Sequence, residues 1–190
     1  TLGRVQATND GRRPYAVAAF SGSIGNGYGV VWPDDLETKV GFVRINTRGE
    51  IAQATTIDLG TQHLASAALS LAWSDSEQEF AMLYVVDEMP EQVYVLRLDE
   101  NGLVQGSPTL LSTTYEPTGA GLHIEALGAQ DYLAMREAQA AGHYGLVYSQ
   151  VKQSAGSVGM GLSELLIRDP ATPVGTASQM EVARVDPNDP

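Results

Sequence analysis

The chain has 190 residues, enough for one domain with a sizeable core, and it contains no cysteine. Disulfides, thiolate nucleophiles and cysteine-bound zinc are therefore excluded. The formal net charge of −12 disfavours binding to nucleic acid or to an anionic membrane surface, because both need a basic face. We interpret the acidity as a source of solubility, with a bound cation or a basic partner as the alternative. No apolar run approaches the roughly 20 residues that a membrane-spanning helix needs.

Short apolar segments bounded by turn residues predict β-strands along the chain, beginning with 3–8. Three groups of four strands follow, at 15–20, 27–32, 40–45 and 50–55; 68–73, 79–84, 93–98 and 103–107; and 122–127, 131–136, 145–151 and 157–160. A last strand is predicted at 178–185. Segment 131–141 is also rich in helix-forming residues, but its place in the series favours a strand.

The three groups are copies of one unit of about 53 residues. Tyr28, Phe80 and Tyr132 lie in corresponding strands, and each is 52 residues from the next. A glycine closes the turn before the fourth strand of each unit, where a tight hairpin needs a positive φ, and these residues are Gly49, Gly102 and Gly156.

Four-stranded units with short connections predict an all-β protein, either a β-propeller or part of one, in which each unit is a blade. The predicted blades are 11–59, 60–112 and 113–167, with 1–10 as the last strand of a preceding blade and 168–190 as the start of a further one. Propellers usually close with at least four blades. We therefore expect that another chain or copy completes the ring, or that the chain is a fragment. Either way, we expect uncovered blade faces that attract a protein partner or self-association.

Two units share an aromatic-rich strand, at 28–32 and 80–84, followed by a strand that ends in a turn. The turns read R-I-N-T-R-G at 44–49 and R-L-D-E-N-G at 97–102. This pattern resembles the degenerate β-propeller repeats of bacterial exported proteins and lipoproteins, although the third unit lacks the arginine before its turn. The resemblance implies a propeller and a periplasmic or extracellular location. It implies no particular activity, since propellers host binding, scaffolding and enzymatic roles.

Carboxylates cluster in the loops between the second and third strands, which a propeller would gather on one face as an acidic rim. They are Asp34, Asp35 and Glu37 in the first unit and Asp87, Glu88 and Glu91 in the second. Calcium takes oxygen ligands of this type, but the spacing matches no known calcium loop. We expect solvated acidic loops with no resident metal or cofactor, and calcium is the alternative.

The third unit carries polar residues where the others have apolar ones, a pattern that can mark a ligand site. His123 and Glu125 lie on the strand expected to line the central channel, and Arg136 takes the place of Trp32 and Tyr84. We predict a ligand site at these three polar residues, and a solvent-facing blade is the alternative. The aromatic residues would also suit a stacked carbohydrate, although we expect them to pack between blades.

No G-x-S-x-G, H-E-x-x-H or P-loop motif occurs in the chain. We therefore predict a non-catalytic binding or scaffolding module. One alternative is a propeller enzyme that acts on polysaccharide, with a channel-lining carboxylate such as Glu125 as its acid or base. The other alternative is the structural half of a split propeller.

Overall fold

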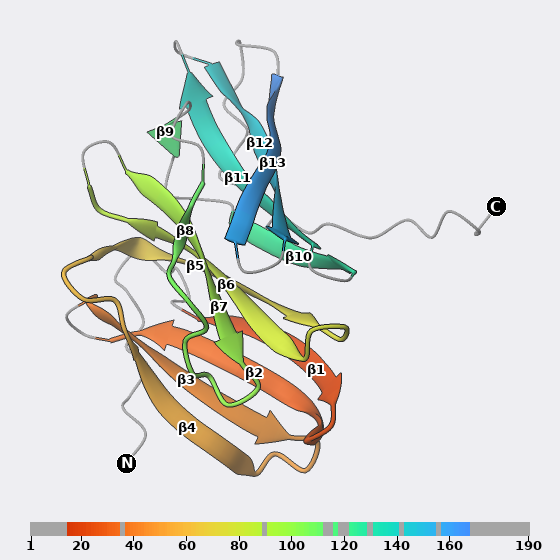
Figure 1. Cartoon of the computed structure of the whole chain (residues 1–190). Helices are drawn as coiled ribbons and strands as arrows, with labels where there is room; N and C mark the ends of the chain where they lie inside the picture. The colour runs from red at the N-terminus through yellow and green to blue at the C-terminus, as the bar shows by residue number, and fades with distance from the viewer. Residues whose placement is uncertain are drawn as a thin grey trace.

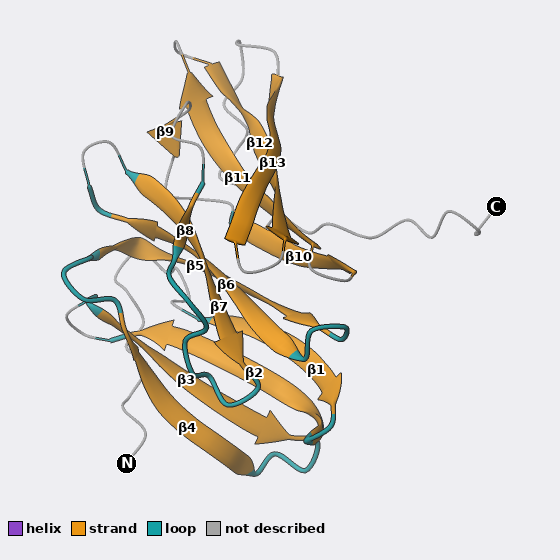
Figure 2. Cartoon of the chain, in the orientation of Figure 1, coloured by secondary structure: helices purple, strands orange, loops and turns teal. Residues whose placement is uncertain are grey.

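A computed structural model of the chain describes residues 15–34, 37–88, 91–111, 116–117, 122–128, 131–140, 143–154 and 157–167. Within these ranges the regular secondary structure is β-strand, without helix (Figure 2). Accordingly, no helix capable of crossing a bilayer occurs in the described part of the chain. The prediction of an all-β protein is confirmed. The segments 1–10 and 168–190, which we assigned to flanking blades, lie outside the described residues.

The strands form three antiparallel sheets that follow one another along the chain (Figure 1). The first sheet contains β1 (Ala16–Gly22), β2 (Gly25–Pro33), β3 (Lys39–Asn46) and β4 (Ile51–Asp58). The second contains β5 (Leu64–Ser74), β6 (Glu79–Val86), β7 (Gln92–Asp99) and β8 (Thr109–Leu110). The third contains β10 (His123–Gly128), β11 (Asp131–Ala140), β12 (His143–Ser154) and β13 (Ser157–Ile167), and the short β9 (Glu116–Pro117) pairs with β11. Apart from β9, which pairs with β11 and not with β10, strands adjacent in the sequence are adjacent in each sheet, so the four main strands of every sheet form a meander.

The fourth strand of the second unit differs from the sequence-based expectation of 103–107. Val104 forms only an isolated bridge, with Leu98, and the strand β8 pairs with β7 further along the chain. Gly102 and Gly106 have φ angles of 80° and 78°. These left-handed conformations interrupt the extended backbone that a continuous strand requires.

Strand β11 resolves the choice between helix and strand in the third unit. Every residue from Asp131 to Ala140 pairs with β12, and part of the strand also pairs with β10. Helix formers such as Ala, Met, Gln and Glu therefore lie in a strand, because ladder pairing and packing override a weak local propensity.

The three sheets stack face to face with the second sheet in the middle (Figure 1). All eight residues of β6 are buried, and successive side chains point to opposite faces. Phe80 and Met82 join the core between the first and second sheets, whereas Ala81 and Leu83 join the core between the second and third. The continuous apolar run in β6 thus reflects a strand that is covered on both faces.

An aromatic cluster fills the interface between the first and second sheets. The ring centroid of Phe80 lies 5.9 Å from that of Phe20, 5.4 Å from Phe42 and 4.6 Å from Trp73. A Cβ atom at Gly29 would lie 2.6 Å from Cε1 of Phe80. Glycine at this position therefore lets the Phe80 ring approach the first sheet closely.

A second apolar cluster joins the second and third sheets. Ile124, Tyr132 and Ala134 of the third sheet share it with Leu83 and Val95 of the second, and each of these residues is at most 2% exposed. The middle sheet is therefore buried on both of its faces, and by different neighbours.

Candidate functional site

The first sheet packs on the second through one face, and its opposite face, here called the outer face, is apolar and partly exposed. Residues paired in antiparallel register lie on the same face, so the pairings define its rows. The rows are Val17, Val30, Val43 and Ala54, then Ala19, Tyr28, Ile45 and Ile51, with Trp32 and Gly41 beside them. Val17 is 47% exposed, and Tyr28 and Ile51 are each 50% exposed. Apolar residues gathered and exposed on one face are typical of interaction surfaces.

The outer face corresponds to surfaces that are buried in the other two sheets. Phe80, the counterpart of Tyr28 in the second unit, is fully buried against the first sheet. Tyr132, the counterpart in the third unit, is 1% exposed and packs on the second sheet. Tyr28 therefore occupies a position that inserts into a preceding sheet elsewhere in the chain, but no sheet in the described ranges covers it.

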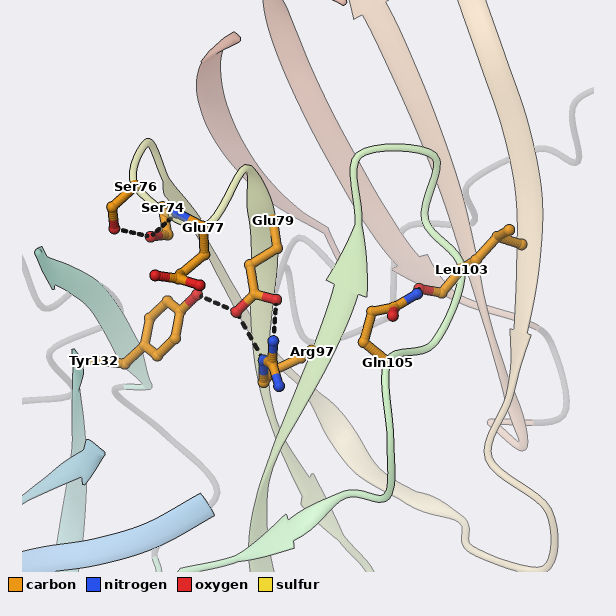
Figure 3. A network of polar contacts seen from close by, with 8 residues as sticks. All are labelled: Ser74, Ser76, Glu77, Glu79, Arg97, Leu103, Gln105 and Tyr132. Atoms are coloured by element: carbon orange, nitrogen blue, oxygen red, sulfur yellow. Dashed lines mark hydrogen bonds and ion pairs between the residues drawn. The ribbon is translucent and has the colours of Figure 1, made fainter. Parts of the chain in front are cut away.

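A polar network joins the second and third sheets (Figure 3). Nε and Nη2 of Arg97 donate to Oε1 and Oε2 of Glu79 at 2.7 and 2.5 Å. The hydroxyl of Tyr132, which comes from the third sheet, donates to Oε1 of the same carboxylate at 2.8 Å. Glu79 is 4% exposed, so the network is a buried bidentate ion pair with an additional tyrosine donor.

The pKa directions in this network agree with a stable, fully bonded arrangement. Burial, together with the charge of Glu79, raises the pKa of Tyr132 far above its ordinary value. The hydrogen bond to Glu79 is the main cause that raises the pKa of Arg97. Because both oxygens of the buried carboxylate accept hydrogen bonds, from Arg97 of the second sheet and Tyr132 of the third, Glu79 joins the two sheets.

The predicted ligand residues in the third unit are brought together only in part. His123 and Glu125 share a face of β10, with Nε2 and Oε2 3.7 Å apart. Their register partners on β11 are Met135 and Leu133. The backbone of Arg136 pairs with β12, and Arg136 follows Met135, the register partner of His123, by one residue. The side chain of Arg136 lies outside the described structure.

In the first acidic loop, Asp34 has a structural role. Its Oδ1 atom accepts hydrogen bonds from the backbone N–H groups of Thr38 and Lys39, both at 3.1 Å. The carboxylate thus closes the turn between β2 and β3, as short polar side chains commonly do. Asp35 lies outside the described residues.

The second acidic loop lies beside the first. Asp87 and Glu88 are exposed after β6, and the N–H of Asp87 donates to the carbonyl of His63 at 2.8 Å. The next residue, Leu64, donates to the carbonyl of Glu37 in the first loop, also at 2.8 Å. Both loops therefore contact consecutive residues, His63 and Leu64, where the connection from β4 enters β5. Among the described residues, however, no three histidines or carboxylates are grouped so that they would hold a metal ion.

The chain matches no family model, no curated protein and no solved structure. The resemblance to propeller repeats is thus an inference from the quoted residues.

The Glu79, Arg97 and Tyr132 network was not among the sequence-based predictions. One signal was present in the sequence: Glu79 and Arg97 are charged residues in mostly apolar strands, 79–86 and 92–99. A charge in a buried strand needs a partner. Tyr132, however, is 53 residues from Glu79, so the third member depends on how the sheets stack.

Proposed function

We propose that the chain is a non-catalytic scaffolding module made of β-propeller blades, whose ring is completed by further blades. One observation carries this proposal: the second sheet is buried on both faces, whereas the equivalent outer face of the first sheet is partly exposed. Each blade of a propeller has two neighbours. The second sheet has both, and the first sheet lacks one within the described residues.

Contacts between the first strands of neighbouring sheets support a radial arrangement. β1 and β10 both lie against β5, on either side of it. Nε1 of Trp73 in β5 donates to the carbonyl of Ser21 in β1 at 3.2 Å. On the other side, the N–H of Ile124 in β10 donates to Oγ of Ser70 in β5 at 3.1 Å. In a propeller the first strand of each blade lies next to the central axis, where the blades converge. Hydrogen bonds between the first strands of neighbouring sheets are therefore expected there.

The polar groups also favour scaffolding. Glu79 is buried, and its carboxylate is engaged by two partners. Asp34 is engaged by its own turn. These carboxylates stabilise the interface and the loop, and the surface that remains for recognition consists of sheet faces and loop ends.

Distances between spin labels test the radial arrangement. The chain has no cysteine of its own, so labels attach only at introduced cysteines. One pair, Ser21→Cys with Ser76→Cys, reports on the end of β1 and the turn after β5. A second pair, Thr56→Cys with Leu110→Cys, reports on equivalent positions of the last strands β4 and β8. All four positions are exposed.

Blades that diverge from an axis give a clearly shorter distance for the first pair than for the second. Equal distances would indicate a flat stack of sheets and would reject the propeller. Unfolding curves of the labelled chains provide the control, because they show whether the substitutions preserve the fold.

A further inference from the structure

We propose that the outer face of the first sheet binds the third sheet of a second copy of this chain, so that copies associate head to tail. The surface it binds is the far face of the third sheet, defined as the face turned away from the second sheet. Its residues are His123, Glu125, Leu133 and Met135. This inference names the partner in the scaffold proposed above and therefore depends on the propeller arrangement.

The two interfaces within the chain are of one kind. In each, an aromatic residue at the start of a sheet's second strand projects into the face of the preceding sheet: Phe80 into the first sheet and Tyr132 into the second. The outer face carries Tyr28 at the equivalent position, so it would form the half of a third such interface from which the aromatic side chain inserts, here called the inserting half. The far face of the third sheet is the receiving half, because Leu133 alternates with Tyr132 and Ala134, which face the second sheet. A second copy therefore supplies the half that the described residues of each copy lack.

The chemistry of the far face suits a tyrosine. Tyr132 is accommodated by a carboxylate on the preceding sheet, since its hydroxyl donates to Glu79. The far face offers Glu125, whose side chain is 41% exposed. A tyrosine hydroxyl buried at this interface would thus meet a carboxylate acceptor, as a buried polar group requires.

The number of sheets is compatible with a closed assembly of two copies. The described residues of each copy form three sheets. Two such sets of three, joined at both junctions, would form a ring of six, within the range of about four to eight blades in which propellers close. Head-to-tail contacts give closed rings when the rotation between copies closes, and a ring leaves no inserting face open.

The mass of the purified chain in solution, measured by light scattering on a sizing column, is the first test. We expect twice the chain mass of 20.2 kDa. Tyr28→Glu places a charge on the outer face and should weaken association roughly 30-fold or more, as loss of an interface anchor does. The matched control is Leu103→Glu, because Leu103 is 54% exposed but lies in the turn before β8, and it should leave the dimer intact. A monomeric wild-type chain, or equal effects of the two variants, would overturn the proposal.

Mixing two variants tests the head-to-tail geometry. Leu133→Glu damages the far face and should also yield monomers. Tyr28→Glu retains an intact far face and Leu133→Glu an intact outer face, so an equimolar mixture should form a two-chain complex through one junction. If two outer faces bound each other instead, Leu133→Glu would remain dimeric and the mixture would gain nothing, and this result would refute the assignment.

Photo-crosslinking identifies the contact without relying on the folding of Leu133→Glu. Val17→Cys, at a position 47% exposed on the outer face, carries a benzophenone maleimide, and half of the copies are isotope-labelled so that crosslinks between copies can be recognised. Crosslinks between copies should map to β10 and β11. Crosslinks to β1–β4, or none between copies, would reject the second copy as the partner. The spin-label distances are also measured on the monomeric variant Tyr28→Glu. If the wild-type chain does not dimerise but the distances show sheets that diverge from an axis, the head-to-tail association is refuted and the propeller proposal is not.

Discussion

Removing one hydroxyl, by Tyr132→Phe, should weaken the junction between the second and third sheets by a measurable amount. The ring of Tyr132 is 1% exposed and packs in the apolar cluster, and phenylalanine retains that packing. The substitution deletes only the 2.8 Å hydrogen bond to Oε1 of Glu79. The change in unfolding free energy therefore reports the contribution of that bond.

Its magnitude follows from the charge on the acceptor. A hydrogen bond to an ionised group contributes about 1.5–3 kcal/mol. The carboxylate of Glu79 keeps both hydrogen bonds from Arg97 in the variant, so it is not left without a donor. We therefore expect the lower part of that range, a loss of about 1.5–2 kcal/mol.

Tyr84→Phe is the matched control. Tyr84 is also fully buried, but its hydroxyl donates to the neutral amide oxygen of Gln62 at the longer distance of 3.3 Å. The expected loss is below about 1 kcal/mol, because neutral bonds contribute less than charge-assisted ones. Urea unfolding followed by tryptophan fluorescence and far-UV circular dichroism gives both values, and coincident curves justify a two-state analysis.

A double-mutant cycle with Glu79→Gln separates the bond from other effects of the substitution. When Glu79→Gln is already present the acceptor is neutral, so Tyr132→Phe should cost about 1 kcal/mol less than in the wild type. Two results would contradict the reasoning: a loss for Tyr132→Phe no larger than that for Tyr84→Phe, or the same loss with and without Glu79→Gln. Either would show that the hydroxyl does not contribute a charge-assisted bond between the sheets.

Three further predictions concern a turn, pH and salt. Gly49 and Gly102 have nearly equal φ angles of 81° and 80°, but a Cβ atom at Gly102 would collide with the ring of Phe42, whereas one at Gly49 would meet no atom within 4 Å. Gly102→Ala should therefore lower the unfolding free energy by about 1–3 kcal/mol more than Gly49→Ala does. Equal losses of stability in urea unfolding would contradict this expectation. Burial raises the pKa of Tyr84 and Tyr132 above the ordinary value of 10.0, so the unfolded chain loses these protons first. Stability should be unaffected by these groups below pH 10 and should fall above it by up to about 1.4 kcal/mol per pH unit for each tyrosine, and urea midpoints between pH 8 and 11 that stay level would refute the assignment. Because each copy carries a net charge of −12, raising salt from about 0.05 to 0.5 M should strengthen the proposed dimer by screening repulsion, and a dimer that dissociates with salt would point to a charged interface instead.

Much of the local structure could be predicted from the sequence. The short apolar runs with turn residues between them correspond to strands in all three sheets, because side-chain burial and turn chemistry are encoded locally. The sequence also predicted a positive φ for the glycines at the ends of the turns, and Gly49 and Gly102 both have one. Local reasoning was insufficient for 103–107, where two left-handed glycines shift the pairing toward β8, and for β11, whose composition permits a helix.

The candidate site, in contrast, was decided by tertiary structure. The sequence placed His123 and Glu125 on one strand, and they share a face, because residues two apart in a strand always do. It did not reveal that Glu79 would be bonded by a tyrosine 53 residues away, or that Phe80 and Tyr132 would be covered while Tyr28 stays half exposed. The repeat makes these three aromatic positions equivalent in sequence. Only the stacking of the sheets makes them differ, because burial depends on which surface lies opposite, and that surface comes from another unit.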